Sequence, residues 1–219
     1  MKKLFLASSG LEYIKQFVGF GPSEVKMLFI PTAGNLDKDA WWIDKDRDVL
    51  GKMGFQITEL DISKASVDEM QKQLDATDIV YIAGGNTFYL LKQLQDSGFD
   101  KLLKNFVEGG GLYAGVSAGA IVAGVDIEPV LTLDEPEKVH GLESTKGLGF
   151  VNIVPIPHYD MASRSAAIDE IKEKYAGKYD IVLLTDEDAI YVEGDTWKVV
   201  KSAKTALEHE WFNNNHDGV

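Results

Sequence analysis

The chain has 219 residues, of which 45% are hydrophobic and 26% are charged, an ordinary balance for a globular protein with a sizeable core. It contains no cysteine, which excludes disulfides, thiolate metal sites and a cysteine nucleophile. The formal net charge of −13 argues against a nucleic-acid partner, because binding to phosphates requires a basic surface. We expect one domain over residues 1–219, with a frayed polar tail over about 210–219.

The chain starts with two lysines after Met1, followed by a short apolar run that ends at Ala7. This run is too short for a signal peptide, and it predicts a first buried strand instead. No segment approaches the ~18 consecutive apolar residues that a membrane-spanning helix needs. We therefore expect a cytoplasmic protein without a membrane partner, and the sequence leaves its oligomeric state open.

Short apolar runs alternate with helical patterns along the chain. The predicted strands cover residues 3–8, 26–31, 56–60, 79–83, 111–114, 153–156, 181–184, 189–192 and 197–201. The predicted helices cover residues 11–20, 38–53, 66–74, 87–96, 99–108 and 163–175. The early strands are continuously apolar, as expected when helices cover both faces of a parallel sheet. The pattern predicts a doubly wound α/β fold with a mostly parallel sheet flanked by helices and a C-terminal β-hairpin.

One strand-to-helix junction carries a serine between two glycines. Residues 112–120 are Leu-Tyr-Ala-Gly-Val-Ser-Ala-Gly-Ala, which contains Gly-x-Ser-x-Gly. This is the spacing of a nucleophile elbow, where a sharp turn lifts a serine hydroxyl above the edge of the sheet. Gly115 and Gly119 fit, because a side chain at either position would crowd the turn. Ser117 is therefore a candidate nucleophile, although a small-residue turn with an incidental serine is the alternative.

A second glycine turn, Ala-Gly-Gly-Asn-Thr at residues 83–87, follows the strand predicted at 79–83. Ligands of an open parallel sheet bind beyond the carboxyl ends of its strands, so this turn and the elbow should lie at the same edge. A backbone N–H of the two glycines could donate to an oxyanion. Asn86 or Thr87 is also a candidate N-cap of the next helix.

A serine nucleophile needs a base and an acid that orients the base. His158 directly follows an apolar strand and a proline, which makes it the favoured base. Two acidic segments, 134–137 and 185–188, could supply the acid, and the second is favoured because it ends an apolar strand. Arg164 starts a predicted helix and could grip a substrate carboxylate, or it could simply face solvent.

Together these segments resemble the peptidase E family, which comprises α-aspartyl dipeptidases and cyanophycinase-like relatives. The matching segments occur in family order and are 84–87, 115–120, 157–159 with Arg164, and 186–187. The resemblance implies a fold similar to that of class I glutamine amidotransferases, with serine in place of the nucleophilic cysteine. It also implies serine peptidase chemistry without a metal or cofactor.

The resemblance implies roles for the residues of the two glycine turns and for the base. Ser117 is expected to be the nucleophile and His158 the general base. The backbone amides of Gly85 and Ala118 are expected to form the oxyanion hole.

The resemblance also maps the acid and the substrate contacts. Glu187 is the expected acid, with Asp134 as the alternative, and Arg164 and Asn86 are expected to bind substrate. The implied activity is that of a serine exopeptidase that cleaves after an N-terminal aspartate in a short peptide.

Two other functions remain open at this point. One is a cyanophycin-like peptide or an ester as the substrate of the same serine. The other is a homologue that keeps the elbow for binding without turnover. Ile121, where aspartyl dipeptidases tend to carry a polar residue, and the short interval from His158 to Arg164 leave the dipeptide specificity open.

Overall fold

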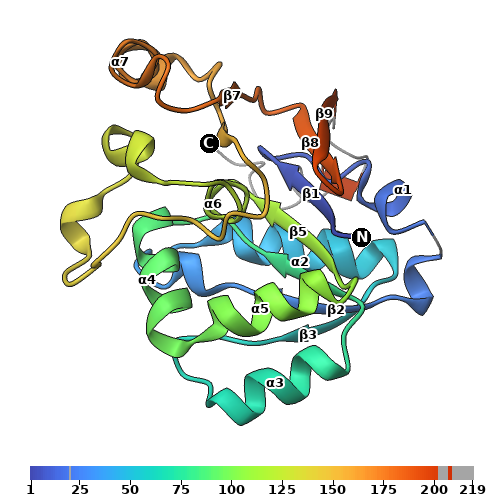
Figure 1. The fold of residues 1–219 in the computed structure, drawn as a ribbon. Coiled ribbons are helices and arrows are strands. Elements are labelled where there is room, and N and C mark those ends of the chain that lie inside the picture. Colours follow the sequence, from blue (N-terminus) through green and yellow to red (C-terminus); the bar gives the residue numbers. More distant parts are fainter. Residues whose placement is uncertain (20, 202–206, 209–219) are drawn as a thin grey trace.

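The computed structural model describes residues 1–19, 21–201 and 207–208, and within these residues a seven-stranded sheet runs through the middle of the protein (Figure 1). The strand order is β3-β2-β4-β5-β1-β8-β9. Five parallel strands form most of the sheet: β1 (Lys3–Ala7), β2 (Lys26–Ile30), β3 (Gln56–Glu59), β4 (Ile79–Ile82) and β5 (Leu112–Val116). The hairpin of β8 (Asp188–Glu193) and β9 (Thr196–Lys201) joins β1 in antiparallel orientation.

Helices cover both faces of this sheet, which explains why the inner strands are apolar without interruption. The helices on one face are α1 (Ile14–Val18) and α2 (Trp41–Met53). Those on the other face are α3 (Val67–Asp75), α4 (Thr87–Ser97), α5 (Phe99–Glu108) and α6 (Ala118–Val122). Along β4, Val80 and Ile82 belong to one core and Ile79 and Tyr81 to the other.

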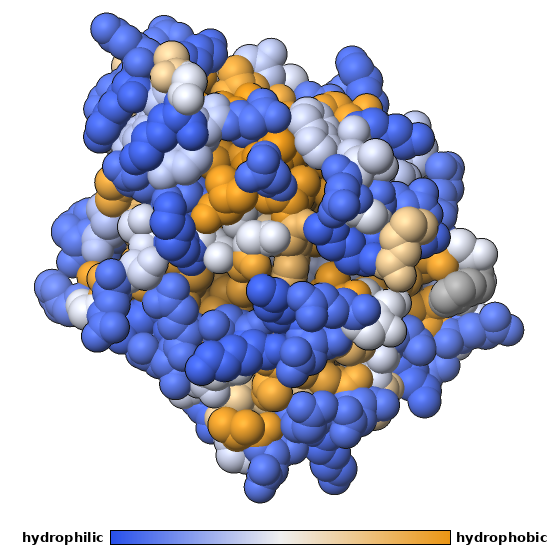
Figure 2. All heavy atoms as spheres, in the orientation of Figure 1, coloured by the Kyte–Doolittle hydropathy of each residue, from blue (hydrophilic) through white to orange (hydrophobic). Residues whose placement is uncertain are grey.

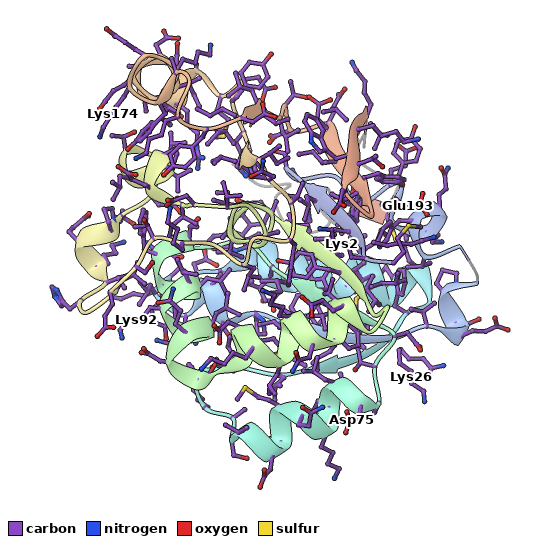
Figure 3. All side chains as sticks on the ribbon, in the orientation of Figure 1. Lys2, Lys26, Asp75, Lys92, Lys174 and Glu193 are labelled. Atoms are coloured by element: carbon purple, nitrogen blue, oxygen red, sulfur yellow. The ribbon has the colours of Figure 1, made fainter. Side chains whose placement is uncertain are left out.

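The face of the molecule drawn in Figure 2 is mostly polar. Figure 2 shows hydrophilic side chains over most of the visible face, and a hydrophobic area next to α7 (Ser165–Tyr175). Charged side chains such as Lys26, Asp75 and Lys174 lie at the edge of the molecule (Figure 3). In the part of the chain that the structure describes, no helix combines the length and the apolar character that crossing a bilayer requires.

The predicted fold is confirmed: the central sheet is mostly parallel, helices flank it, and the C-terminal strands form a hairpin. One pair of strands differs from the expectation of a single sheet. The strands β6 (Val154–Ile156) and β7 (Ile181–Leu183) form a separate two-stranded parallel sheet. They cannot join β1, because β5 and β8 already occupy both of its sides.

Some helices are also shorter than expected: α2, for example, begins at Trp41 and not at residue 38. The first helix, expected over 11–20, is a short α1 that ends before Gly19, whose φ of 78° terminates it. The helix expected over 163–175 begins at Ser165, because a 3-10 turn over Ala162–Arg164 precedes it. The predicted frayed tail, 210–219, lies outside the described residues, and the assignment of the whole chain to one domain stays a prediction.

Candidate active site

Ser117 occupies the tight junction between β5 and α6, as the elbow motif predicts. The Ser117 backbone has φ 51° and ψ −111°. Among the described residues, Ser117 and His158 are the only ones other than glycine that have a positive φ. Such conformations cost about 1–3 kcal/mol each and persist where the surroundings hold them. The Ser117 amide donates to Ala7 O at 3.0 Å, and the Ala120 amide donates to Ser117 O at 2.9 Å. The strain is therefore held in place at the proposed nucleophile.

The two glycines of the motif are required by close packing of the backbone. A Cβ added at Gly115 would lie 2.3 Å from Gly119 O, and one added at Gly119 would lie 2.2 Å from Ile82 O. Both distances are far below any contact that a real Cβ makes. The glycine spacing thus brings α6 against the ends of β4 and β5.

His158 lies beside Ser117, although 40 residues of chain separate them. Its Nε2 is 3.1 Å from Ser117 Oγ, within hydrogen-bonding distance. The residue follows β6 and Pro157 and has a φ of 59°. Its backbone amide donates to Ser8 Oγ at 2.9 Å, which fixes this conformation. The structure therefore brings the predicted nucleophile and base together at the carboxyl edge of the sheet.

Asp186, and not Glu187, contacts the imidazole. Asp186 Oδ1 is 2.5 Å from His158 Nδ1, whereas Glu187 is exposed. The turn before β8 explains the difference, because Asp188 Oδ2 accepts from the amide and the hydroxyl of Thr185 at 2.9 and 2.7 Å. With the turn fixed in this way, the Asp186 side chain lies against His158 and the Glu187 side chain lies in solvent. The structure therefore brings Asp186, one residue before the predicted Glu187, into contact with His158, and the identity of the acid stays a prediction.

Asp134, the alternative acid, lies at the start of α4 instead. Its Oδ2 accepts from the Thr87 amide at 2.9 Å, and its negative charge suits the N-terminus of a helix. Burial raises the pKa of Asp134, while hydrogen bonding by Thr87 and the charges of Arg164 and His158 oppose that rise. Asp134 therefore belongs to the surroundings of the site and does not orient His158.

The second glycine turn packs directly against the nucleophile. A Cβ added at Gly84 would lie 3.1 Å from Ser117 Cβ. Gly85 has a φ of 145°, and a Cβ there would lie 2.3 Å from the carbonyl carbon of Ala33. Within the described residues, the amides of Gly85 and Ala118 donate to no acceptor. The Ala118 amide directly follows Ser117 in the chain, and the Gly85 amide belongs to the turn that packs against Ser117.

Asn86 holds this turn together, and its role in substrate binding stays a prediction. Its Oδ1 accepts from the Tyr89 amide at 2.8 Å, so it caps α4 as the alternative interpretation proposed. Its Nδ2 donates to Glu135 O at 3.2 Å. Because both ends of the amide are bonded within the protein, Asn86 holds the start of α4 against the loop that carries Asp134.

Arg164 is half-buried at the end of the 3-10 turn before α7. Its charge opposes the rise in the pKa of Asp134, which places it electrostatically close to the site. In the described part of the chain, the Arg164 side chain forms no ion pair with a carboxylate. The guanidinium is thus charged, near the site and not committed to an internal carboxylate.

Ser8 is a site residue that the sequence analysis missed. It is completely buried at the end of β1, and its Oγ lies 3.3 Å from His158 Nδ1 and donates to Asp186 Oδ1 at 3.4 Å. Its place directly after a predicted parallel strand was the signal that could have found it. Among the described residues, no group of three or more His, Asp or Glu side chains is arranged to hold a metal ion.

The profile of peptidase family S51 matches residues 4–200, a range that contains every residue of this site. The chain belongs to peptidase family S51. It is therefore a serine-type peptidase, and the resemblance to peptidase E is confirmed.

Several known proteins match this chain over three quarters of their own length or more. An uncharacterised peptidase of Listeria monocytogenes is 33% identical over 196 residues, which cover 89% of this chain and 96% of the relative. Peptidase E of Salmonella arizonae is 29% identical over 183 residues, which cover 82% of this chain and 75% of the relative. A crystal structure of a Listeria monocytogenes protein assigned to peptidase E superposes with a TM-score of 0.82 at 31% identity, covering 93% of this chain and all of that one.

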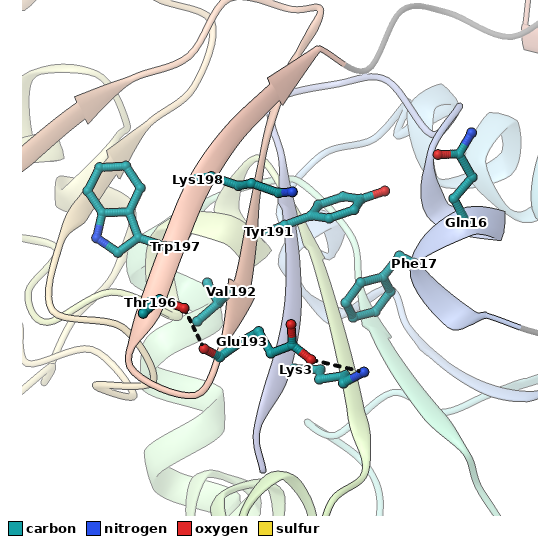
Figure 4. Close-up of a pocket in the computed structure, with 9 residues that line it drawn as sticks. All are labelled: Lys3, Gln16, Phe17, Tyr191, Val192, Glu193, Thr196, Trp197 and Lys198. Carbon is teal, nitrogen blue, oxygen red and sulfur yellow. Dashed lines mark hydrogen bonds and ion pairs between the residues drawn. The ribbon is translucent and has the colours of Figure 1, made fainter.

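A pocket of about 490 Å³ lies elsewhere on this S51 peptidase, between α1, β1 and the β8–β9 hairpin (Figure 4). Lys3 and Glu193, which form an ion pair at 3.3 Å, lie at its edge, and Phe17, Tyr191 and Trp197 are among its lining residues. Since Lys3 begins β1 whereas the site lies beyond the end of that strand, the pocket is at the opposite edge of the sheet. It is not part of the candidate active site.

Proposed function

We propose that this S51 peptidase is an exopeptidase that hydrolyses short peptides with an N-terminal aspartate, such as Asp-X dipeptides, through an acyl-enzyme. The observation that carries the proposal is the hydrogen-bonded series from Ser117 through His158 to Asp186, with distances of 3.1 and 2.5 Å. This is the arrangement in which an imidazole activates an alcohol and a carboxylate orients the imidazole.

The catalytic cycle follows from these contacts. With Nδ1–H of His158 donating to Asp186, Nε2 is free to accept the proton of Ser117 Oγ as that oxygen attacks the substrate carbonyl. The amides of Gly85 and Ala118 donate to the oxyanion of the tetrahedral intermediate. His158 then gives the proton to the leaving amine, and water hydrolyses the acyl-enzyme by the same route in reverse.

Arg164 supplies the proposed preference for an acidic substrate side chain. A guanidinium can bind a carboxylate through two parallel hydrogen bonds, and among the described residues this one forms no direct ion pair, although its charge acts on the nearby Asp134. In a chain with a net charge of −13, the positive charge of Arg164, which acts on Asp134 near the site, also attracts an anionic substrate locally. The cytoplasmic location and the absence of a nucleic-acid partner stay predictions from the sequence.

A panel of Asp-X, Glu-X, Asn-X and β-aspartyl dipeptides, assayed with the natural enzyme and with Ser117→Ala, tests the proposal. We expect cleavage of Asp-X that disappears in the variant. Cleavage restricted to β-linked peptides or esters would move the assignment to a cyanophycinase-like or other acyl hydrolase. A protein that cleaves no substrate and whose Ser117 does not react with a fluorophosphonate would be a binding protein instead.

A further inference from the structure

The Gly84–Gly85 turn is held from outside the site by Trp42. The indole Nε1–H of Trp42, in the first turn of α2, donates to Gly84 O at 3.0 Å. On its other side, the turn is anchored by the Asn86 amide, which donates to Ala33 O at 2.9 Å. The backbone between these two anchors carries the Gly85 amide that faces the oxyanion in the proposed mechanism.

The bond to Gly84 O determines where the Gly85 N–H points. Both groups belong to one peptide unit, which is planar and trans, so its C=O and N–H point in opposite directions. Two consecutive glycines leave this unit little steric resistance to rotation. A flip would turn the Gly85 N–H away and bring the Gly84 carbonyl oxygen, a partial negative charge, toward the developing oxyanion.

The position of Trp42 relative to this turn is itself fixed by a buried contact. One helical turn after Trp42, Asp46 Oδ2 accepts a hydrogen bond from the hydroxyl of Tyr81 at 2.6 Å. Both Asp46 and Tyr81 are buried, and Tyr81 lies in β4, the strand that leads into the glycine turn. Two side-chain hydrogen bonds, Tyr81 to Asp46 and Trp42 to Gly84, therefore connect α2 with β4 and the turn that follows it. Together they hold the indole against Gly84.

We propose that Trp42 is a positioning residue for the oxyanion hole. Its indole N–H keeps the Gly84–Gly85 peptide in the orientation in which the Gly85 amide can stabilise the transition state. The role rests on the proposed function, because it presupposes an oxyanion at Ser117. Removal of one oxyanion donor typically lowers kcat by about 10²–10³-fold, and a misoriented donor loses part of that contribution.

Trp42→Phe is the decisive variant, because it removes the indole N–H and keeps an aromatic ring. Trp41→Phe is the matched control: Trp41 is the neighbouring residue and contacts the Trp42 ring edge to face at 6.0 Å. Three measurements are needed, namely kcat and KM on the best dipeptide, the rate at which a fluorophosphonate labels Ser117, and thermal unfolding.

We expect Trp42→Phe to lower kcat and the labelling rate about 10- to 100-fold, with KM changed less than about twofold. Trp41→Phe should keep both rates within about threefold. The proposal is overturned if the two variants have the same kcat, or if Trp42→Phe changes KM alone. A natural enzyme that neither turns over peptides nor reacts with the fluorophosphonate would refute the proposed function, and the role of Trp42 with it.

Discussion

At the scale of single residues, the chemistry of the site depends on which of several neighbouring polar side chains points inward. The loop 185–188 offers three consecutive carboxylates, and the turn closed by Asp188 presents only Asp186 to His158. Ser8 adds a hydroxyl that contacts both the imidazole and its acid. The polar side chains of the site thus contact one another in a connected network. Single substitutions should show how much each side chain contributes to activity.

Asp186→Asn should lower kcat by about 10³–10⁴-fold with a small change in KM, because an amide cannot hold the imidazole tautomer that the serine needs. Glu187→Gln is the matched control, since the neighbouring side chain is exposed, and it should stay within about threefold of the natural enzyme. Steady-state kinetics on an Asp-X substrate measures both. A large loss of kcat in Glu187→Gln alone would restore the acid predicted from the sequence.

Arg164→Met should weaken hydrolysis of Asp-X about 30-fold or more in kcat/KM, because the substrate carboxylate loses its charged partner. Hydrolysis of Asn-X should change much less, since an uncharged amide depends little on the guanidinium. The ratio of kcat/KM for Asp-X to that for Asn-X is the quantity to measure. An equal loss for both substrates would rule out recognition of a carboxylate by Arg164.

At the scale of elements, the loop after β3 supports the 3-10 turn Thr32–Gly34, which packs against Gly85. The carboxylate of Asp61 accepts hydrogen bonds from Thr32 Oγ1 at 3.0 Å and from Asn35 Nδ2 at 3.1 Å. Burial acts to raise the pKa of Asp61, but the hydrogen bonds from Lys64, Ser63 and Asn35 outweigh it and hold the pKa well below its usual range. The ionised carboxylate therefore stabilises this pair of loops.

Asp61→Asn should reduce the free energy of unfolding by about 1–3 kcal/mol at pH 7, since the hydrogen bonds to a charged acceptor become bonds to a neutral one. The folded-state pKa lies below the unfolded value of about 3.9, so the contribution is complete above that value and is lost as the pH falls further. Urea unfolding at pH 7 and at about pH 3 should show a difference between the proteins that shrinks in acid. An unchanged difference would contradict the role of the ionised form.

At the scale of the whole molecule, a buried group of charges connects the described C-terminal residues with α2 and β4. Lys45 Nζ lies 3.1 Å from Glu208 Oε1 and 3.1 Å from Asp46 Oδ1, and all three side chains are buried. Burial raises the pKa of Asp46, and the charge of Lys45 together with the hydrogen bond from Tyr81 opposes that rise. Lys45 contacts both carboxylates, so it couples the three segments.

Lys45→Met should lower the free energy of unfolding by about 3–5 kcal/mol, because it removes the ammonium that both buried carboxylates contact. Lys52→Met is the matched control on the same helix, since its partner Asp48 and Lys52 itself are both about 40% exposed, at 42% and 41%. That exposed pair should contribute less than about 1 kcal/mol. Urea unfolding at pH 7 compares the variants, and equal values for both would show that the buried group does not stabilise the fold.

The sequence by itself determined the features that depend on local backbone geometry and periodicity. Apolar runs without alternation specify parallel strands covered on both faces, and the glycines around Ser117 specify a turn that only residues without a side chain can form. The position of His158 at the end of an apolar strand suggested that it lies near Ser117, and the two side chains are 3.1 Å apart although β6 belongs to a separate sheet.

Only the tertiary structure decided which side chains complete the site. The choice between Asp186 and Glu187 is a difference of one residue in a turn, and the two have the same charge in the same loop. The Asn86 side chain donates its hydrogen bond to Glu135 O, within the protein. Trp42 contacts the glycine turn from a helix about 40 residues earlier in the chain. The direction of a side chain in a turn, and its partner from a distant segment, are set by packing between elements, which periodicity and local propensity do not encode.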